Sequence, residues 1–471
     1  MATSSVDVHQ LEKLRPLGSS HVTVSCTTVI NKPLGKLEEF SSARHHLGIF
    51  LNVGISVSYT YKGALGVDLR ETIFSALSDV IQRHPVLSTI PVDEDSAAPY
   101  FARLPEINLE DAVTFLIRQD SSDGHSQDAE LDSLLERQHN IDFKANYGSV
   151  PFWRLLILTN PNSDIEFVAS FIYHHALGDG ASGIAFHKHF FASLTSAAVR
   201  QGSKIIYSLT KPLLPNLELL HPLPIPPASP YLQESALWTG TPVRLPMRTL
   251  FRTLTLSHQL TTSLIQTCRT HQTTLTSTLP VLIARVLRRL LPGGPHALKC
   301  IIPVNIRRFL PRDSIADDDM GVWIDAISIS YDSAKIPTWD EAQRSKDIIS
   351  AYLASDGQRI NVARMKQRGD MREFFLSLVG KERDSSFEVS NLGVVKNMKE
   401  EVKNEGWSMG RCRFSRSAFA AGSAFSIGTI TGCDGCLCLG FSWQESVIER
   451  NIMEEIVEGV KTEVEQVTRE R

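Results

Sequence analysis

The chain of 471 residues is predicted to have a mixed α/β fold made of two halves, each with its own strands and helices. Short apolar runs typical of buried strands occur in both halves of the sequence. Segments with one apolar face at helical spacing stand between these runs. The halves are separated by the proline-rich stretch Pro212–Pro230, which sustains neither a helix nor a central strand and is expected to be an extended crossover.

The first half is predicted to begin with strands separated by a loop over residues 21–62. Further helices and strands follow from apolar periodicity, and Asp68 is the expected N-cap of the first helix. The expected elements are helices at Val67–Arg83, Leu131–His139 and Ser182–Val199, and strands at Trp153–Leu158 and Ile165–Tyr173.

The second half is predicted to repeat this mixture of strands and helices. Its expected elements are a strand near Arg252–Leu256, a helix through Leu264–Cys268, a stronger helix at Thr276–Leu291, a buried strand at Lys299–Asn305 and a terminal helix from about Ile448. We therefore divide the chain into a first half (1–210), a crossover (211–248) and a second half (249–471).

Composition excludes several classes of protein. The chain is 42% hydrophobic and 21% charged, which is typical of a globular protein, and its net charge of -4 gives no electrostatic reason to expect nucleic acid or an anionic membrane as partner. The first twenty residues lack the apolar core of a signal peptide, and no apolar run is long enough to span a bilayer. We expect a cytoplasmic protein without a transmembrane segment.

Seven cysteines, an odd number, favour a reducing compartment. Cys433, Cys436 and Cys438 cluster around Asp434-Gly435, which is a hairpin-turn signal. A zinc site would need a fourth ligand, and no second C-x-x-C pair exists. The cluster therefore favours a hairpin with buried thiols over metal or redox chemistry.

The most informative motif is the run from Tyr173 to Gly180, Tyr-His-His-Ala-Leu-Gly-Asp-Gly, at the end of an apolar strand. Neighbouring side chains on a strand point to opposite faces, so one of His174 and His175 should face a cavity and the other should pack or hydrogen-bond. A neutral imidazole in a dry cavity suits removal of a proton near neutral pH. Gly178 and Gly180 would allow a tight turn and close approach of the backbone to a ligand. The alternative interpretation is a core histidine beside a surface turn.

The spacing His-His-x-x-x-Asp-Gly resembles the active-site motif of the acyl-CoA-dependent acyltransferase superfamily, which includes chloramphenicol acetyltransferase, condensation domains, plant BAHD enzymes and fungal alcohol acetyltransferases. The fungal alcohol acetyltransferases are the nearest resemblance, because further matching segments follow in the expected order. The Asp-Phe-Gly-Trp-Gly motif of BAHD enzymes and a carrier-protein domain are absent. The matching segments include Arg15-Pro16-Leu17-Gly18, Ser42-Ala43-Arg44, His84-Pro85-Val86-Leu87, Pro303-Val304-Asn305-Ile306-Arg307 and Val389-Ser390-Asn391-Leu392-Gly393.

The resemblance implies two chloramphenicol acetyltransferase-like half-domains with the active-site channel between them, and it implies a role for each motif residue. His175 would be the general base, and His174 would be structural. Asp179 would pair with Arg307 and fix the loop that holds His175; Arg44 and Arg308 are rival partners. Gly180 would let the backbone approach the acyl group.

Ser390 and Asn391 are candidate hydrogen-bond donors to the oxyanion of the tetrahedral intermediate. The alternative is a polar strand end that satisfies its own backbone. No serine or cysteine sits in a recognisable nucleophile setting, so direct transfer in a ternary complex is expected rather than a covalent acyl-enzyme.

Three other groups of residues are given ordinary roles. His45-His46 lacks the following aspartate and glycine, and it is expected to be partly exposed, without a metal. His187 and His189 would point to different faces of a helix and are poor metal ligands as a pair. The arginines at 285, 288 and 289 could meet CoA phosphates, but a solvated helix face is the preferred interpretation.

The sequence therefore predicts a CoA-dependent O-acyltransferase that acetylates a small alcohol, with acyl-CoA as co-substrate and no permanently bound cofactor or metal. Three alternatives stay open: N-acylation of an amine, transfer from a carrier protein, and a catalytically silent binding protein on the same fold. The intact motif argues against the last.

Overall fold

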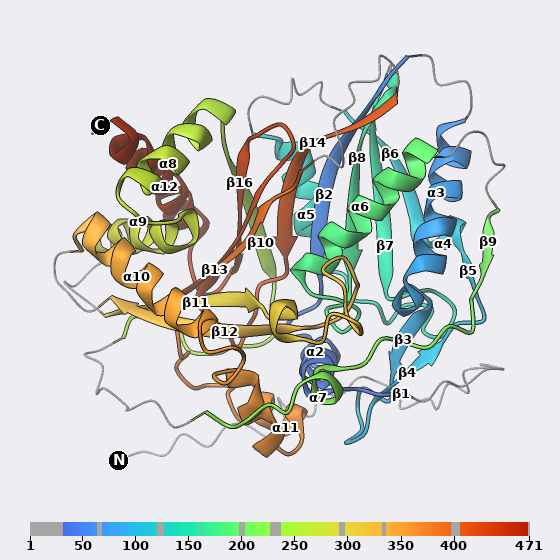
Figure 1. Ribbon diagram of the computed structural model, residues 1–471, viewed down its shortest axis with the longest axis horizontal. Coiled ribbons are helices and arrows are strands. Elements are labelled where there is room, and N and C mark those ends of the chain that lie inside the picture. The colour runs from blue at the N-terminus through green and yellow to red at the C-terminus, as the bar shows by residue number, and fades with distance from the viewer. Residues whose placement is uncertain are drawn as a thin grey trace.

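Two sheets form the centres of two lobes (Figure 1). The first lobe has a five-stranded sheet of order β14-β2-β8-β7-β6, and the second has a six-stranded sheet of order β10-β16-β15-β13-β11-β12. Both sheets combine parallel and antiparallel pairs, so the predicted mixed α/β class is confirmed. The computed structural model describes residues 32–63, 68–119, 127–161, 163–196, 203–226, 237–291, 297–331, 336–396 and 406–469.

The sheet of the first lobe is built around β8, which carries the histidine motif at its end. Its antiparallel partners place Ile55 and Leu155 opposite Phe171, and all three side chains are buried. The predicted strands at 153 and 165 are confirmed. The strands are β2 (Val53–Lys62), β6 (Val113–Ile117), β7 (Trp153–Asn160), β8 (Ser163–Tyr173) and β14 (Gly406–Arg416).

Helices α3 (Leu69–Arg83) and α6 (Gly180–Ser196) pack against each other beside this sheet, and α6 also contacts β2. Asp68 caps α3 as predicted, because its side chain accepts a hydrogen bond of 3.1 Å from the Glu71 amide. The ring of Phe186 stacks on Phe171 at 3.7 Å, which ties α6 to β8. The first lobe also contains α5 (Ala129–Gln138), which confirms the helix predicted at 131.

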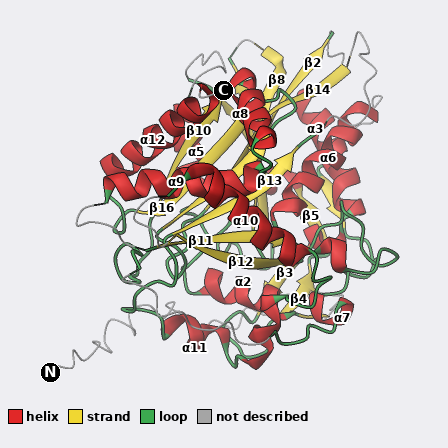
Figure 2. Ribbon diagram, turned by 60° about the vertical axis from the view of Figure 1, so that its left-hand side comes forward, coloured by secondary structure: helices red, strands yellow, loops and turns green. Residues whose placement is uncertain are grey.

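The second lobe buries one face of its sheet under helices. Figure 2 shows α8, α9, α10 and α12 gathered on one side of the strands. Buried Glu463 of α12 pairs with Arg285 and Arg289 of α9 and holds these two helices together. The elements are β10 (Thr249–Leu256), β11 (Leu298–Asn305), β12 (Ile324–Tyr331), β13 (Phe387–Val394), β15 (Phe425–Thr431), β16 (Leu437–Gln444), α8 (His258–Thr270), α9 (Leu275–Leu290), α10 (Thr338–Leu353) and α12 (Arg450–Arg469).

Smaller elements surround the two sheets, and two of them correct the sequence prediction. Residues 36–46 form a helix where a loop was predicted; residues 21–31 lie outside the described ranges. This helix lacked an apolar stripe because its buried face is polar, with Ser41, Ser42 and His45. A single helical turn lies between Pro215 and Pro222 of the predicted extended crossover. The smaller elements are β1 (Lys32–Pro33), α2 (Lys36–His46), β3 (Thr89–Val92), β4 (Tyr100–Arg103), β5 (Glu106–Asn108), α4 (Leu109–Ala112), β9 (Ile205–Tyr207), α7 (Leu217–Leu220) and α11 (Met371–Leu376).

Strands β15 and β16 form the hairpin predicted around the cysteines. Cys436 and Cys438 are buried, and the cysteines within the described ranges are free thiols. Across the same ranges, none of the helices combines the length and apolar character that crossing a bilayer requires.

Strand β14 joins the two lobes. It follows β13 of the second sheet in the chain, yet it pairs antiparallel with β2 of the first sheet (Figure 1). It also passes close to β15 and β16, where Gly428 and Gly440 face the backbone of Phe414. The division of the chain at 210 and 248 stays a prediction, and β14 shows that the second segment completes the first sheet.

Gly440 should be intolerant of any side chain. A Cβ at this position would overlap the carbonyl oxygen of Phe414, which is backbone and has little room to move. We expect Gly440→Ala to lower the free energy of unfolding by about 1–3 kcal/mol, as overpacking does. Urea denaturation measures the loss.

Gly369→Ala is the matched control, because Gly369 is exposed and no atom lies within 4 Å of its would-be Cβ. This variant should stay within about 0.5 kcal/mol of the parent. Equal losses in both variants would show that β14 does not press on the second sheet at Gly440.

Candidate active site

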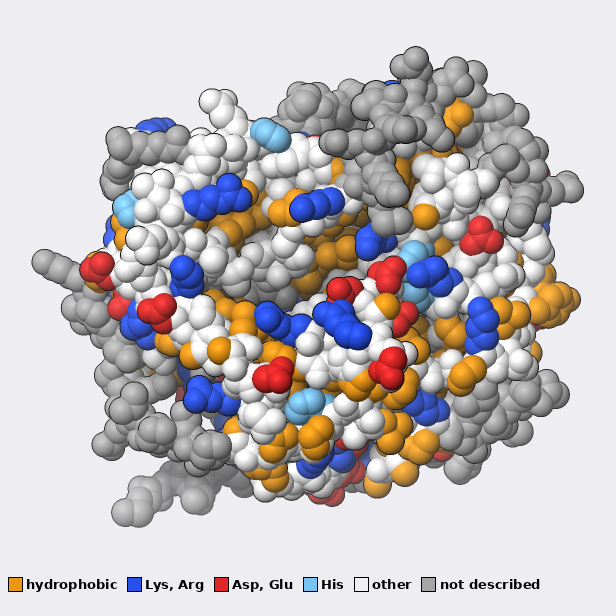
Figure 3. Space-filling view, viewed as in Figure 1, with side chains coloured by type: hydrophobic (Ala, Val, Ile, Leu, Met, Phe, Trp, Pro, Cys, Tyr) orange, Lys and Arg blue, Asp and Glu red, His pale blue; other side chains and the backbone are white. Residues whose placement is uncertain are grey.

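A cavity of about 400 Å³ lies between the lobes and is lined by residues of both. The first lobe contributes His175 and Gly180, and the second contributes Asn305 and Ser390. On the face shown in Figure 3 the surface is hollowed between the lobes, with hydrophobic side chains inside and Lys and Arg side chains near the edge. The walls thus offer an apolar space in which a few polar groups can orient a ligand.

The two motif histidines diverge as predicted. Strand β8 ends at Tyr173, and the backbone amide of His174 still bonds to Phe152, which keeps the chain extended. His174 is fully buried behind the cavity wall, whereas His175 lines the cavity and is partly exposed there.

His174 belongs to a buried cluster around the carboxylate of Glu94. Its Nδ1 accepts the Ala176 amide at 3.0 Å, so its proton is on Nε2, which lies 3.5 Å from Glu94. Burial tends to raise the pKa of Glu94, but neighbouring His45 and His174 hold it well below its usual range. Ser42 donates a third hydrogen bond of 2.8 Å to the same carboxylate.

His45 has the same arrangement, which corrects the expectation that it is partly exposed. It is buried, its Nε2 accepts the Phe143 amide at 3.1 Å, and its Nδ1 lies 3.1 Å from Glu94. Both histidines therefore direct an N–H, and no lone pair, toward Glu94. Although the three residues lie close enough together to hold a metal, this arrangement leaves no imidazole ligand for one.

His175 has the properties of a neutral base. Its Nδ1 is buried with no partner outside its own residue, so Nε2 is the nitrogen left to meet a substrate in the cavity. Burial lowers the pKa of His175 to about 3, and the positive charge of nearby Arg44 acts in the same direction. The ring is therefore uncharged near neutral pH and able to accept a proton.

Asp179 and Arg307 form the predicted ion pair, which joins the first lobe to the second. Two parallel hydrogen bonds of 2.7 and 3.0 Å join the carboxylate to the guanidinium, and both side chains are almost completely buried. The carboxylate also accepts the amides of Ser182 and Trp323 at 3.0 and 3.1 Å. Burial opposes ionisation of Asp179, but Arg307 holds its pKa below the usual value.

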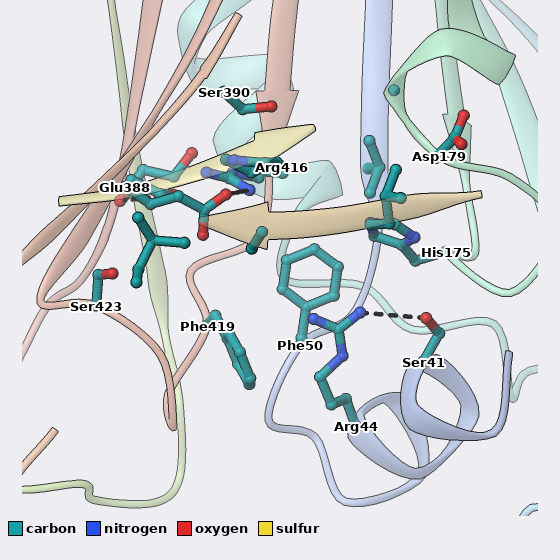
Figure 4. A pocket seen from close by; sticks show the side chains of 18 of the residues that line it. Ser41, Arg44, Phe50, His175, Asp179, Glu388, Ser390, Arg416, Phe419 and Ser423 are labelled. Atoms are coloured by element: carbon teal, nitrogen blue, oxygen red, sulfur yellow. Dashed lines mark hydrogen bonds and ion pairs between the residues drawn. The ribbon is translucent and has the colours of Figure 1, made fainter. Parts of the chain in front are cut away.

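These contacts leave Asp179 no part in proton transfer, because every one of its acceptor positions is used. Both terminal nitrogens of Arg307 are also used: Nη1 bonds to Asp179, and Nη2 bonds to Asp179 and to the carbonyls of Asp319 and Gly321. The rival partners lie elsewhere, Arg308 on the surface and Arg44 in the cavity wall. Figure 4 shows Asp179 apart from His175.

The motif glycines are required for space rather than for a special turn. Neither Gly178 nor Gly180 has a positive φ. A Cβ on Gly180 would lie 2.6 Å from Leu392 of β13, and one on Gly178 would lie 2.5 Å from Ser182. Gly180 therefore lets the start of α6 approach the second lobe.

Ser390 and Asn391 differ in what they can donate. The Asn391 amide bonds to Thr276 at 2.9 Å and accepts the Gly393 amide at 2.9 Å, which matches the alternative of a polar strand end that satisfies its neighbours. Ser390 lines the cavity, and Figure 4 shows it in the wall across from His175. Of the two candidates, Ser390 is therefore the one whose side chain has no described partner and lines the cavity.

Arg416 and Glu388 are cavity residues that sequence reasoning missed. They come from β14 and β13, and they pair at 2.5 Å inside the cavity (Figure 4). Arg44, expected only as a rival partner for Asp179, lines the same cavity. No spacing in the sequence brings these three residues together, because they lie on the separate elements α2, β13 and β14.

The remaining polar groups have structural roles. Arg285 and Arg289 are paired with Glu463 and lie away from the cavity, so the structure does not place them at a CoA site. His187 bonds to Ile55 and Tyr59, whereas His189 bonds to His84 and Asp318. The two helix histidines therefore point to different faces, as predicted.

Known proteins resemble this chain along most of its length. The sequence model of the alcohol acetyltransferase family matches residues 33–226. The "Probable alcohol acetyltransferase crmB" of Aspergillus fumigatus is 38% identical over 452 residues, which cover 90% of this chain and 97% of that protein.

Two solved structures share the fold. The TRI3 trichothecene 15-O-acetyltransferase of Fusarium sporotrichioides superposes with a TM-score of 0.69 at 14% identity, covering 92% of this chain and 94% of that one. The first condensation domain of the calcium-dependent antibiotic synthetase gives a TM-score of 0.63 at 13% identity, covering 93% and 97%. At these identities the likeness shows the fold alone.

Asp179 and Arg307 should behave as one unit. Removing one partner of a buried ion pair leaves the other charge buried and unpaired. Asp179→Asn or Arg307→Gln alone should therefore lower the free energy of unfolding by about 3–5 kcal/mol. The double variant should cost little more than either single change. A double-mutant cycle by urea denaturation, with kcat measured in parallel, tests this.

The exposed pair Arg312–Asp317 supplies the control, because its side chains are 57% and 77% exposed. Its coupling should not exceed about 1 kcal/mol. If the losses of unfolding free energy from the two single changes simply added up in the double variant, Asp179 and Arg307 would not act as a coupled pair, which we call the clamp.

Proposed function

The chain belongs to the alcohol acetyltransferase family and is an acyltransferase; we propose that it transfers an acetyl group from acetyl-CoA to the hydroxyl of a small alcohol in the cytoplasm. The observation that carries this proposal is the position of His175. Its imidazole faces a cavity that both lobes line. Such a site suits general-base catalysis between two bound substrates. The G-x-S-x-G run at residues 406–410 lies within strand β14, so Ser408 does not stand at the strand-to-helix turn of a nucleophile elbow.

The reaction follows from these residues. Nε2 of His175 takes the proton of the alcohol as its oxygen attacks the thioester carbonyl, and the hydroxyl of Ser390 donates to the oxyanion that forms. The C–S bond then breaks. The CoA thiolate leaves with the pair of electrons and recovers the proton from His175, so the base returns to its neutral state.

The second lobe holds this machinery in place. The clamp of Asp179 and Arg307 fixes the turn after His175, and the Glu94 cluster fixes His174 immediately before it. The base is thus held on both sides, which keeps its geometry constant through the reaction. His174 and Asp179 are therefore positioning residues.

His175→Ala should lower kcat by at least about a hundredfold, the usual contribution of a general base. Release of free thiol from acetyl-CoA, in the presence of a panel of simple alcohols or amines, measures the rate. Binding of CoA and the unfolding midpoint should change little. Near-parental turnover by the folded variant would exclude His175 as the base.

Two controls support this test. His258→Ala removes an exposed histidine far from the cavity and should leave kcat unchanged. For the parent, the low pKa of His175 keeps its ring neutral, so kcat/KM should not fall as the pH drops through about 6.5, the ordinary value for histidine.

Kinetics should show direct transfer. Because one cavity holds residues from both lobes and no acyl-enzyme is required, double-reciprocal plots for acetyl-CoA and alcohol should intersect. Intact-protein mass spectrometry with acetyl-CoA alone should find no acylated protein. Parallel lines together with a stoichiometric adduct would overturn the direct mechanism.

A further inference from the structure

We propose that the substrate bound beside His175 carries a carboxylate, held between Arg44 and Arg416. This inference rests on the proposed function and adds the chemical class of the substrate. It follows from two arginines in the cavity wall, each of which has guanidinium N–H groups that no described residue accepts.

Arg44 is the first of these. Its side chain rises from α2 into the cavity and is only 7% exposed, yet Ser41, at 3.2 Å, is its one hydrogen-bond partner among the described residues. Three aromatic rings surround the guanidinium, with their centroids 4.4, 4.5 and 4.9 Å away; they belong to Phe40, Phe50 and Phe419. The rings fix the cation in place without using its N–H groups.

Arg416 is the second. It reaches the same cavity from β14, and its side chain is 11% exposed. One of its nitrogens bonds to Glu388 at 2.5 Å, while Nε and the other terminal nitrogen have no partner. A buried guanidinium that offers a fork of unused donors matches the geometry of a carboxylate.

The other charged groups of the cavity wall are already satisfied. Arg383 donates to the carbonyls of Thr241, Ala420 and Gly422. Asp325 accepts a hydrogen bond of 2.6 Å from Tyr352 and the amides of Asn361 and Val362, while burial raises its pKa. Asp179 is neutralised by Arg307.

Glu388 is thus the one carboxylate that faces the two arginines with unused donors, within the described cavity wall. One negative charge opposite two positive charges leaves a local excess of one positive charge. A single bound carboxylate would balance it, and a neutral alcohol would not.

The excess positive charge of Arg44 and Arg416 lies too close to His175 to bind the phosphates of CoA. Arg44 and His175 both contact the ring of Phe50, with separations of 4.5 and 5.7 Å from its centroid. Figure 4 shows Arg44, Phe50 and His175 grouped on one side of the cavity. The pantetheine arm separates the phosphates of CoA from its thioester, so an anion close to His175 belongs to the acyl group or to the acceptor.

The same arrangement would make the base respond to its substrate. Arg44 helps to lower the pKa of His175, and a carboxylate bound to Arg44 would cancel much of this effect. A stronger base would then exist when the correct substrate is present. Selectivity would therefore appear in kcat as well as in KM.

Matched substrate pairs test the proposal on the intact protein. The acceptor pair is 3-hydroxybutanoate and its neutral amide, and the donor pair is malonyl-CoA and propionyl-CoA. We expect kcat/KM to favour the charged member of one pair by at least about tenfold, the effect of a charged hydrogen bond. Preference within the first pair assigns the carboxylate to the acceptor, and preference within the second assigns it to the acyl group.

Three variants connect the preference to these residues. Arg416→Gln should abolish the preference by raising KM for the charged substrate, with little change for its neutral partner. Glu388→Gln should act in the opposite direction, because it frees Arg416 and increases the positive charge. Arg248→Gln, on the surface in a pair with Glu445, is the control. If Arg416→Gln does not fold, the substrate preference of the parent and its change in Glu388→Gln still test the carboxylate site.

The failures are distinguishable. Transfer to neutral and charged members at equal rates, in parent and variants alike, would overturn the carboxylate site and leave the acyltransferase function standing. Absence of thiol release with every alcohol would overturn the proposed function itself. If Arg416→Gln slowed the reaction of the charged substrate and of its neutral counterpart equally, Arg416 would be needed for the structure of the cavity. That result would also overturn the proposal.

Discussion

The ion pair of Asp179 and Arg307 is the interaction on which the site depends. It joins a side chain of the first lobe directly to a side chain of the second in the interior, and Asp179 lies four residues after His175. A buried pair contributes little net stability, because desolvation of both charges offsets their attraction. Its value here is geometric, since only one arrangement of the lobes satisfies both groups and the amides around them.

Strand β14 has a complementary role. It pairs with β2 of the first lobe, and its backbone lies against two glycines of the second sheet. The strand also carries Arg416 into the cavity. The two lobes are thus held together by the buried ion pair at one side of the cavity and by the close packing of β14 at another. The cavity walls contributed by the two lobes therefore cannot move independently of each other.

Polar side chains of the interior lie both behind the cavity wall and in it. Behind the wall, His45, His174 and Ser42 surround the carboxylate of Glu94. His175, Arg44 and Arg416 each have a buried side-chain nitrogen without a partner, and all three line the cavity. Because unpaired polar groups in an interior are costly, a substrate that pairs with these three side chains would offset part of that cost.

The sequence by itself determined the fold class, the main strands and amphipathic helices, the divergence of His174 and His175, and the pairing of Asp179 with Arg307, the last through a motif resemblance. These follow from local periodicity or from a fixed spacing along the chain. The helix at residues 36–46 escaped prediction because its buried face is polar. Only the tertiary structure decided that His45 and Glu94 meet beside buried His174, and that Arg44, Glu388 and Arg416 line the same cavity as His175. Those residues lie on separate elements, and no local pattern encodes which charged side chains a crossing strand brings together.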